Sequence, residues 1–297
     1  MKLLLDVGVL MVNVLTMAAV GMDLEGRHFR EVMHKLPLLV IALVAQTIGL
    51  PLIGWAILQI MGLPPHIGAG ILLVAACPIG NIANFYCLVG RTNLPLSVGL
   101  TVASIAVSLG TMPLTFAGYG ILLGEQFALA TPAPRLVLNV FLMLVMPVLG
   151  GMVLRRNVPV FVARYTRSIQ LTGLAGVAFL LLAILVNQRA QIATEWPQTV
   201  TVSALFMGLA LAGGLACGRL LRLAPTDGLT IGISCAVRSV ALALAVAITV
   251  LDRVEYAAFA AVYFLIEIPL LLIVAGVARR RTQTPESLGR SGQVTTQ

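Results

Sequence analysis

Leu229-Thr-Ile-Gly-Ile-Ser-Cys-Ala-Val-Arg-Ser-Val-Ala-Leu-Ala-Leu-Ala-Val-Ala-Ile-Thr-Val-Leu251 is an apolar stretch long enough to cross a lipid bilayer, with Arg238 near its middle. An arginine at the middle of a bilayer costs from about 2.5 to more than 10 kcal/mol, so it faces a partner, a cavity or a ligand rather than lipid. The position of Arg238 therefore predicts a membrane-spanning fold with a functional site inside it.

The composition supports a membrane fold for the whole chain. Of the 297 residues, 59% are hydrophobic and 10% are charged, whereas soluble domains contain about 25% charged residues. The net charge of +8 does not indicate a nucleic-acid partner, because the basic residues stand at the ends of apolar runs without interleaved aromatic residues. The four cysteines form no CxxC pair and the three histidines lack metal-ligand spacing, so neither a disulfide framework nor a metal site is expected.

Windows of about twenty apolar residues predict nine transmembrane helices joined by short connections. These spans are expected at 3–22, 37–61, 67–90, 94–122, 136–154, 168–187, 197–218, 228–250 and 256–278. They predict a single all-α polytopic membrane domain over residues 1–279, with a first half at about 1–122 and a second half at about 136–279. Residues 280–297 are polar and predict a disordered cytoplasmic tail.

The distribution of Lys and Arg predicts the orientation in the membrane. One set of alternate loops and ends holds fourteen of the 19 basic residues, and the other set holds Lys2, Arg135, Arg189 and Arg253. Because positively charged loops stay in the cytoplasm, the C-terminus is expected inside and the N-terminus outside. We therefore expect an integral protein of the bacterial inner membrane, with the lipid bilayer as its surroundings.

Two of the predicted spans are interrupted. In the third, Pro78 removes a backbone donor and Gly80 weakens the next turn, which places Asn81 and Asn84 at membrane depth. In the eighth, a stretch of small residues surrounds Arg238. Broken helices at corresponding positions of two halves are typical of inverted-repeat transporters, although Pro and Gly are also frequent in ordinary membrane helices. The halves match as a 4+5 inverted repeat if the first half lacks its opening helix, and the two broken helices then cross near the midplane.

The residues around the first interruption resemble those of a known family. Cys77-Pro-Ile-Gly-Asn-Ile-Ala-Asn84, Gly90-Arg-Thr-Asn93 and Leu96-Ser-Val-Gly-Leu-Thr101 are similar to motifs of the bile acid:sodium symporter family, as is Gly21-Met-Asp-Leu24. The resemblance covers nearly the whole chain and is most specific in the third span. It implies a nine-span secondary transporter in which a panel of helices moves against a core by alternating access. It also implies that sodium drives the uptake of a small organic anion.

The family's sodium ligands carry over only in part. Asn84, Ser97 and Thr101 match positions of one sodium site, and Gln46 matches a ligand of the second. These four residues are the residual sodium ligands that the resemblance implies. The alternative for Ser97 and Thr101 is a hydrogen bond to a carbonyl of their own helix, which is frequent for such residues in membrane helices.

The eighth span departs from the family pattern. Ile233 replaces the glutamate shared by both sodium sites, Val237 replaces a glutamine, and Arg238 replaces an asparagine. A fixed positive charge about 6 Å from a bound cation costs about 3 kcal/mol at an effective dielectric of about 20. We therefore expect transport without sodium, by uniport, exchange or proton coupling, and no cofactor. A sodium-coupled symporter with an altered site is the alternative.

Arg238 would then take the place of the bound cation or bind the carboxylate or sulfonate of the substrate. Glu267 is the other charge well inside a span. It is either a structural partner of Arg238 or a proton-titrating carboxylate near the site. The candidate site comprises Arg238, Asn81, Asn84, Ser97, Thr101, Gln46, Ser239 and Glu267, with Pro78 and Gly80 at the helix break.

Other functions agree less well with these residues. A membrane-embedded enzyme would need paired Asp residues, or a Ser with a Lys, at membrane depth, and the predicted spans offer neither. A channel or a sensor is an alternative that saturable, trans-stimulated flux would exclude. Arsenite-efflux and auxin carriers share the architecture that the resemblance implies, but the eighth span lacks the carboxylate expected of an arsenite carrier. The sequence predicts neither the identity of the substrate nor the oligomeric state.

Overall fold

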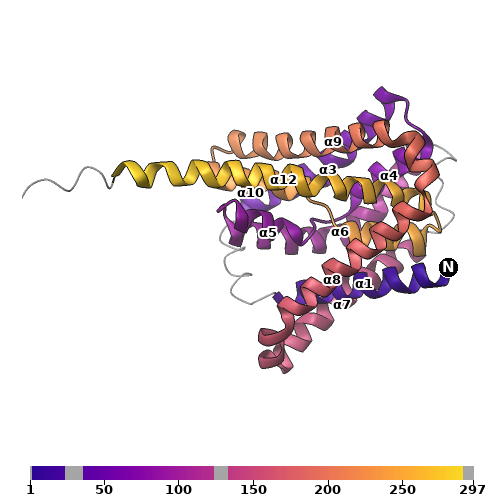
Figure 1. Ribbon diagram of the computed structural model, residues 1–297, viewed down its shortest axis with the longest axis horizontal. Coiled ribbons are helices and arrows are strands. Elements are labelled where there is room, and N and C mark those ends of the chain that lie inside the picture. Colours follow the sequence, from indigo (N-terminus) through magenta and orange to yellow (C-terminus); the bar gives the residue numbers. More distant parts are fainter. Residues whose placement is uncertain (1, 24–35, 124–132, 290–297) are drawn as a thin grey trace, which may run out of the picture.

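The computed structural model describes residues 2–23, 36–123 and 133–289, and in these residues the regular elements are helices (Figure 1). The first half contains α1 (Lys2–Asp23), α3 (Leu36–Met61), α4 (Pro65–Ala76), α5 (Ile82–Val89) and α6 (Leu94–Leu123). The second half contains α7 (Ala133–Asn157), α8 (Pro159–Asn187), α9 (Arg189–Leu220), α10 (Pro225–Ala236), α11 (Val240–Ala245), the π-helix Val246–Val250 and α12 (Val254–Gly289).

Seven of the described helices are long and apolar enough to cross a membrane, namely α1, α3, α6, α7, α8, α9 and α12. The shorter pairs α4–α5 and α10–α11 lie where the two interrupted spans are predicted. Large apolar side chains are exposed on the outside of the bundle, with Leu220 84% and Ile60 83% exposed. Such surfaces are typical of helices whose surroundings are lipid rather than water. The prediction of an all-helical polytopic membrane protein is confirmed.

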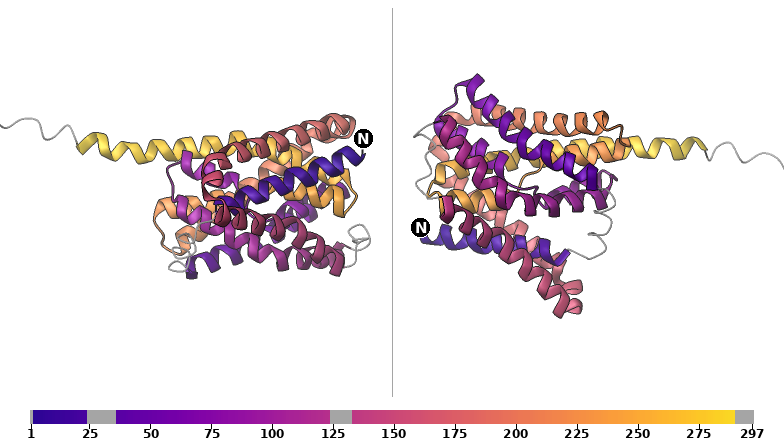
Figure 2. Two further views of the ribbon diagram at one scale, coloured as in Figure 1. Left: turned by 90° about the horizontal axis from the view of Figure 1, so that it is seen from below. Right: turned by 180° about the vertical axis from the view of Figure 1, so that it is seen from behind.

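The helices form two groups that lie side by side (Figures 1 and 2). Helices α1, α7 and α8 pack together in the first group, and the other helices form the second group around the two breaks. Glycine allows the close contact between α1 and α7, because a Cβ atom on Gly151 would lie 2.1 Å from the carbonyl oxygen of Ala18. In the second group, a Cβ on Gly218 of α9 would lie 2.5 Å from the Cα of Gly228 in α10. The half-helix α10 is therefore held backbone to backbone against α9.

A buried asparagine also joins α1 to α7. Pro147 lies inside α7 and has no backbone N–H to donate to the carbonyl of Met143, four residues earlier. The side chain of Asn13, which is fully buried, donates from Nδ2 to this carbonyl oxygen at 2.7 Å. Asn13 therefore satisfies an acceptor that the proline leaves without its usual partner, in the middle of the first group of helices.

Several helices are longer than the apolar windows that predict them. Helix α8 begins at Pro159 rather than near residue 168, and α9 begins at Arg189 rather than near residue 197. Helix α12 continues to Gly289 and projects beyond the bundle (Figure 2). Residues 280–289 thus continue α12, where the sequence predicts the beginning of a disordered polar tail, because an existing helix extends into polar sequence without a new nucleation step. Residues 290–297 lie outside the described residues, as do Arg27, Arg30 and Lys35 of the charge distribution.

Candidate functional site

The two helix breaks meet in the interior of the second group of helices. The amide of Gly80 donates to the carbonyl of Val237 at 3.2 Å, and the amide of Ser239 donates to the carbonyl of Pro78 at 2.9 Å. These bonds form a short antiparallel pairing that uses backbone groups released by the breaks, which would otherwise be costly at membrane depth. Pro78, Gly80 and Ser239 thus lie at the crossover, and Ser239 contributes its backbone amide.

Gly80 is required by the closeness of the two chains at this point. A Cβ atom added to it would lie 2.7 Å from the carbonyl oxygen of Arg238 and 3.0 Å from its carbonyl carbon. Both atoms belong to the backbone, so neither can move aside by a change of rotamer. Glycine is therefore required at position 80 for steric reasons rather than for flexibility.

The central pair of the crossover is Ile79 and Arg238, which form an isolated antiparallel bridge. The amide of Ile79 points away from this bridge and donates to the hydroxyl of Ser104 on α6 at 3.1 Å. The amide of Arg238 points away on the other side and faces the carboxylate of Glu267 on α12. In each break, a backbone amide thus faces a polar side chain of the next long helix, Ser104 of α6 for the first break and Glu267 of α12 for the second.

Replacement of Ser104 by alanine is expected to lower the free energy of unfolding by about 1–3 kcal/mol, because the amide of Ile79 would be left buried without an acceptor. Ser108→Ala is the matched control. Its hydroxyl only donates to the carbonyl of Ile105 in its own helix at 3.0 Å, so a smaller change is expected. Thermal unfolding of the purified variants in one detergent compares the two, and equal losses would contradict the assigned role of Ser104.

The guanidinium of Arg238 bonds to two neutral oxygens. Nη1 donates to Oε1 of Gln46 on α3 and Nη2 donates to the carbonyl oxygen of Ala75 in α4, both at 3.3 Å. Arg238 is only 4% exposed, and within the described residues its Nε has no hydrogen-bond partner. Because a guanidinium carries five N–H groups, donors remain for a further acceptor. The sequence leaves open an ion pair between Arg238 and Glu267. The described residues show no such ion pair.

Arg238 lines a small cavity of about 10 Å³, which is the space of about one water molecule. Its walls come from α3, the end of α4, α6 and the two breaks. The lining residues are Gln46, Thr47, Ala75, Ala76, Cys77, Pro78, Ser104, Ser108, Thr111, Thr115 and Arg238. The wall is therefore mostly polar, and Arg238 is its only charged residue within the described part of the chain.

A row of hydroxyl groups follows one face of α6 from the crossover along this cavity. Ser97, Thr101, Ser104, Ser108, Thr111 and Thr115 recur at intervals of three and four residues, which places them on one side of a helix. Only Ser97 and Thr101 are predicted from the sequence motif. The other four were missed, although hydroxyl residues at helical spacing in an otherwise apolar span are a signal that could have found them.

The predicted ligands of one sodium site lie partly together. The hydroxyl of Ser97 donates to Oδ1 of Asn84 at 2.7 Å, and Nδ2 of Asn84 donates to Oδ1 of Asn81 at 3.1 Å. Thr101 donates to the carbonyl of Ser97 at 2.9 Å, which is the bond within the helix that the sequence left as the alternative. Gln46 lies apart from this cluster, because it contacts Arg238 in the cavity.

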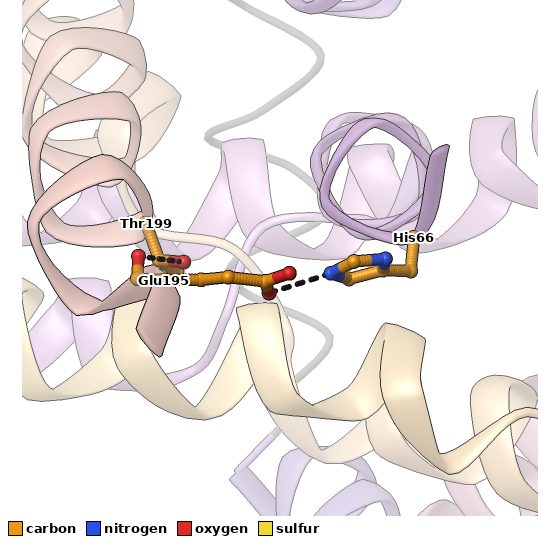
Figure 3. A network of polar contacts seen from close by, with 3 residues as sticks. All are labelled: His66, Glu195 and Thr199. Atoms are coloured by element: carbon orange, nitrogen blue, oxygen red, sulfur yellow. Dashed lines mark hydrogen bonds and ion pairs between the residues drawn. The ribbon is translucent and has the colours of Figure 1, made fainter. Parts of the chain in front are cut away.

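A second polar cluster lies outside the crossover (Figure 3). Nε2 of His66, at the start of α4, lies 2.6 Å from Oε2 of Glu195 on α9, and Thr199 donates to the carbonyl of Glu195. Both side chains are 26% exposed, so the contact is expected to stabilise the fold only slightly. Among the residues that the structure describes, no group of three His, Cys, Asp or Glu could hold a metal ion.

An apolar helical bundle in which two broken helices meet beside a buried charge is the architecture typical of inverted-repeat transporters. The chain belongs to the Sodium Bile acid symporter family, since the sequence profile of this family matches residues 10–195. The resemblance inferred from the third span is confirmed.

Relatives of this chain are described as sodium-coupled transporters. An uncharacterised sodium-dependent transporter of Bacillus subtilis (strain 168) is 23% identical over 70% of this chain and 63% of its own length. A probable chloroplastic sodium/metabolite cotransporter of Oryza sativa subsp. japonica is 26% identical over 76% of this chain and 53% of its own length. Another such cotransporter, of Arabidopsis thaliana, is 30% identical over 46% of this chain and 33% of its own length. The chain thus spans less than two thirds of the length of these relatives.

Proposed function

We propose that this chain is a secondary transporter that carries a small organic anion by alternating access. The observation that carries the proposal is the buried guanidinium of Arg238, which lines a polar cavity and keeps unused N–H donors. Arginine suits this role because its planar fork pairs with carboxylate, sulfonate or phosphate groups and stays protonated. The substrate class is therefore that of small anions with such a group.

The same residue argues against sodium at the second site of the family. Gln46, which the resemblance assigns to that site, bonds to Arg238 instead, together with the carbonyl of Ala75. Ile233 supplies no carboxylate beside it. A sodium ion about 6 Å from the guanidinium would lose about 3 kcal/mol, or roughly a hundredfold in affinity. Arg238 acts here as a built-in cation that holds α3 and α4 to the second break.

The architecture that fits this function is a nine-span 4+5 inverted repeat within a single domain over residues 1–279. The matching relations of Ser104 and Glu267 to the two breaks support such a repeat. Helices α1, α7 and α8 would form the moving panel, and the second group of helices would form the core. The N-terminus would lie outside and the C-terminus in the cytoplasm, as the distribution of Lys and Arg indicates for a bacterial inner membrane.

Uptake into proteoliposomes tests the proposal with radiolabelled anions, a set that includes pyruvate, benzoate and taurocholate. Saturable, trans-stimulated uptake of at least one anion is expected, with an unchanged rate when choline replaces sodium. Flux that neither saturates nor responds to anion on the opposite side would indicate a channel, and no flux at all would contradict a transporter of these anions. A strict sodium requirement would establish the sodium-coupled alternative.

The sodium-coupled alternative has one observation in its favour. Asn84, Ser97 and Asn81 are linked by side-chain hydrogen bonds, so several oxygens gather near the first break. If this cluster binds sodium, Asn84→Ala would remove the sodium dependence or abolish uptake. If transport needs no sodium, the same variant would change uptake in the same proportion in sodium and in choline.

A further inference from the structure

Glu267 is fully buried in the middle of α12, beside the crossover, and its carboxylate is not bonded in the part of the chain that the structure describes. Its side chain is 0% exposed, and neither oxygen reaches hydrogen-bonding geometry with a partner. An ionised carboxylate is costly to bury without several donors, whereas a protonated carboxyl can be satisfied by far fewer groups. The surroundings of Glu267 therefore suit a carboxyl group that binds a proton.

The charged and titratable groups around Glu267 come from three elements. Arg238 faces it with its backbone amide, while the guanidinium is turned towards α3 and α4. Tyr86 on α5 and Tyr263, one turn earlier on α12, are the titratable neighbours of Glu267. The hydroxyl of Tyr263 donates to the carbonyl of Ala236, whereas that of Tyr86 has no partner among the described residues.

The other long elements packed on α12 carry their charged residues near their ends rather than at the level of Glu267. These residues are His66 in α4, Arg164 and Arg167 in α8, and Arg189, Glu195 and Arg219 in α9. Among the residues that the structure describes, Arg238 is therefore the one cation close to the carboxylate, and it does not form an ion pair with it.

We propose that Glu267 binds the proton that accompanies the anion, which makes the proposed transporter a proton-coupled anion symporter. The inference rests on the proposed function. A proton from one side converts the carboxylate of Glu267 to a carboxyl, and the anion binds at Arg238. After the conformational change the anion and the proton leave on the other side, and the carboxylate is restored. One proton and one anion cross per cycle, and Arg238 stays charged throughout.

A proton fits this position better than a metal cation. Hard cations take several oxygen ligands, and near Glu267 the hydroxyl of Tyr263 is already used by a backbone carbonyl. The positive charge of Arg238 would also repel a cation held at the carboxylate. A proton needs no coordination shell and removes the charge of the carboxylate itself.

Glu267→Gln separates this role from a purely structural one, because glutamine keeps the size and the acceptor that face the amide of Arg238. Proteoliposomes are loaded at a pH one unit above the outside, with the membrane potential clamped, and an anion from the set above that the wild type carries is supplied. One proton per anion predicts about tenfold accumulation in the wild type. In Glu267→Gln the anion concentration inside is not expected to exceed the concentration outside, while exchange of labelled for unlabelled anion continues.

Two further variants serve as controls. Glu267→Asp keeps a carboxyl and should retain accumulation, and Glu195→Gln, which alters a carboxylate outside the crossover, should behave as the wild type. Infrared difference spectra of the purified proteins add a readout without any anion. A carboxyl band that changes with pH in the wild type and is missing in Glu267→Gln is expected.

The outcomes separate the two proposals. If the wild type carries none of the anions, the proposed function fails and the proton proposal fails with it. If the wild type carries an anion that the pH gradient does not drive, or Glu267→Gln accumulates as the wild type does, only the proton proposal is overturned. Identical infrared spectra of the wild type and Glu267→Gln would overturn it as well.

Discussion

Arg238→Gln is expected to lower the uptake of a transported anion about a hundredfold at low anion concentration. The glutamine amide removes the fixed positive charge, and the loss of one charge about 6 Å from the anion is worth about 3 kcal/mol at an effective dielectric of about 20. It also removes the fork that bonds to Gln46 and the carbonyl of Ala75. Initial uptake rates into proteoliposomes at matched protein density measure the effect.

Arg238→Lys is the matched control, because it keeps the charge but not the fork. Uptake between that of the wild type and that of Arg238→Gln is expected, since lysine binds oxyanions as a point charge. Unchanged uptake in Arg238→Gln would remove Arg238 from the transport site. A combined Ile233→Glu and Arg238→Asn variant, which restores residues implied by the family resemblance, should make transport dependent on sodium.

Gly80→Ala is expected to destabilise the crossover by about 2–3 kcal/mol, because a backbone clash in a packed interior must be relieved by moving one of the two chains. The added Cβ would lie 2.7 Å from the carbonyl oxygen of Arg238. Any shift lengthens the bonds that join Gly80 to Val237 and Ser239 to Pro78. A lower thermal midpoint together with strongly reduced uptake is the expected result.

The chain offers matched controls for this substitution. A Cβ atom on Gly49 in α3 or on Gly110 in α6 would meet no atom within 4 Å. Alanine at these positions is expected to leave stability unchanged or to raise it slightly, because alanine favours helix more than glycine does. If Gly80→Ala behaved like Gly49→Ala, the steric account of the crossover would be contradicted.

The helix breaks could be predicted from the sequence because their causes are local. Pro78 lacks a backbone donor, and Arg238 is too costly to face lipid. The partners of Arg238 could not be predicted, because Gln46 and the carbonyl of Ala75 reach it only through tertiary packing of α3 and α4. The sequence is compatible with an ion pair between Arg238 and Glu267, whereas in the structure the guanidinium bonds to neutral oxygens.

The spans themselves were predicted more closely than the ends of the helices. Hydropathy predicts the part of a helix that lies in the lipid core. Helices α8, α9 and α12 continue into polar sequence because their backbone hydrogen bonds do not depend on apolar side chains. The row of hydroxyls on α6 was visible in the sequence but was read only where Ser97 and Thr101 match a motif. Polar residues at intervals of three and four mark one face of a membrane helix, as periodic apolar residues do in a soluble one.

The two broken helices are joined through main-chain atoms, with Gly80 bonded to Val237 and Ser239 to Pro78. The hydrogen bonds of this joint are made by main-chain atoms, and Gly80 leaves room for the two closely spaced backbones. Side chains beside it can therefore be exchanged during evolution without loss of the scaffold. Ile233 and Arg238, which the family resemblance marks as replacements, lie beside this joint. The change of driving ion that we propose would therefore require no change in the main-chain hydrogen bonds that join the two broken helices.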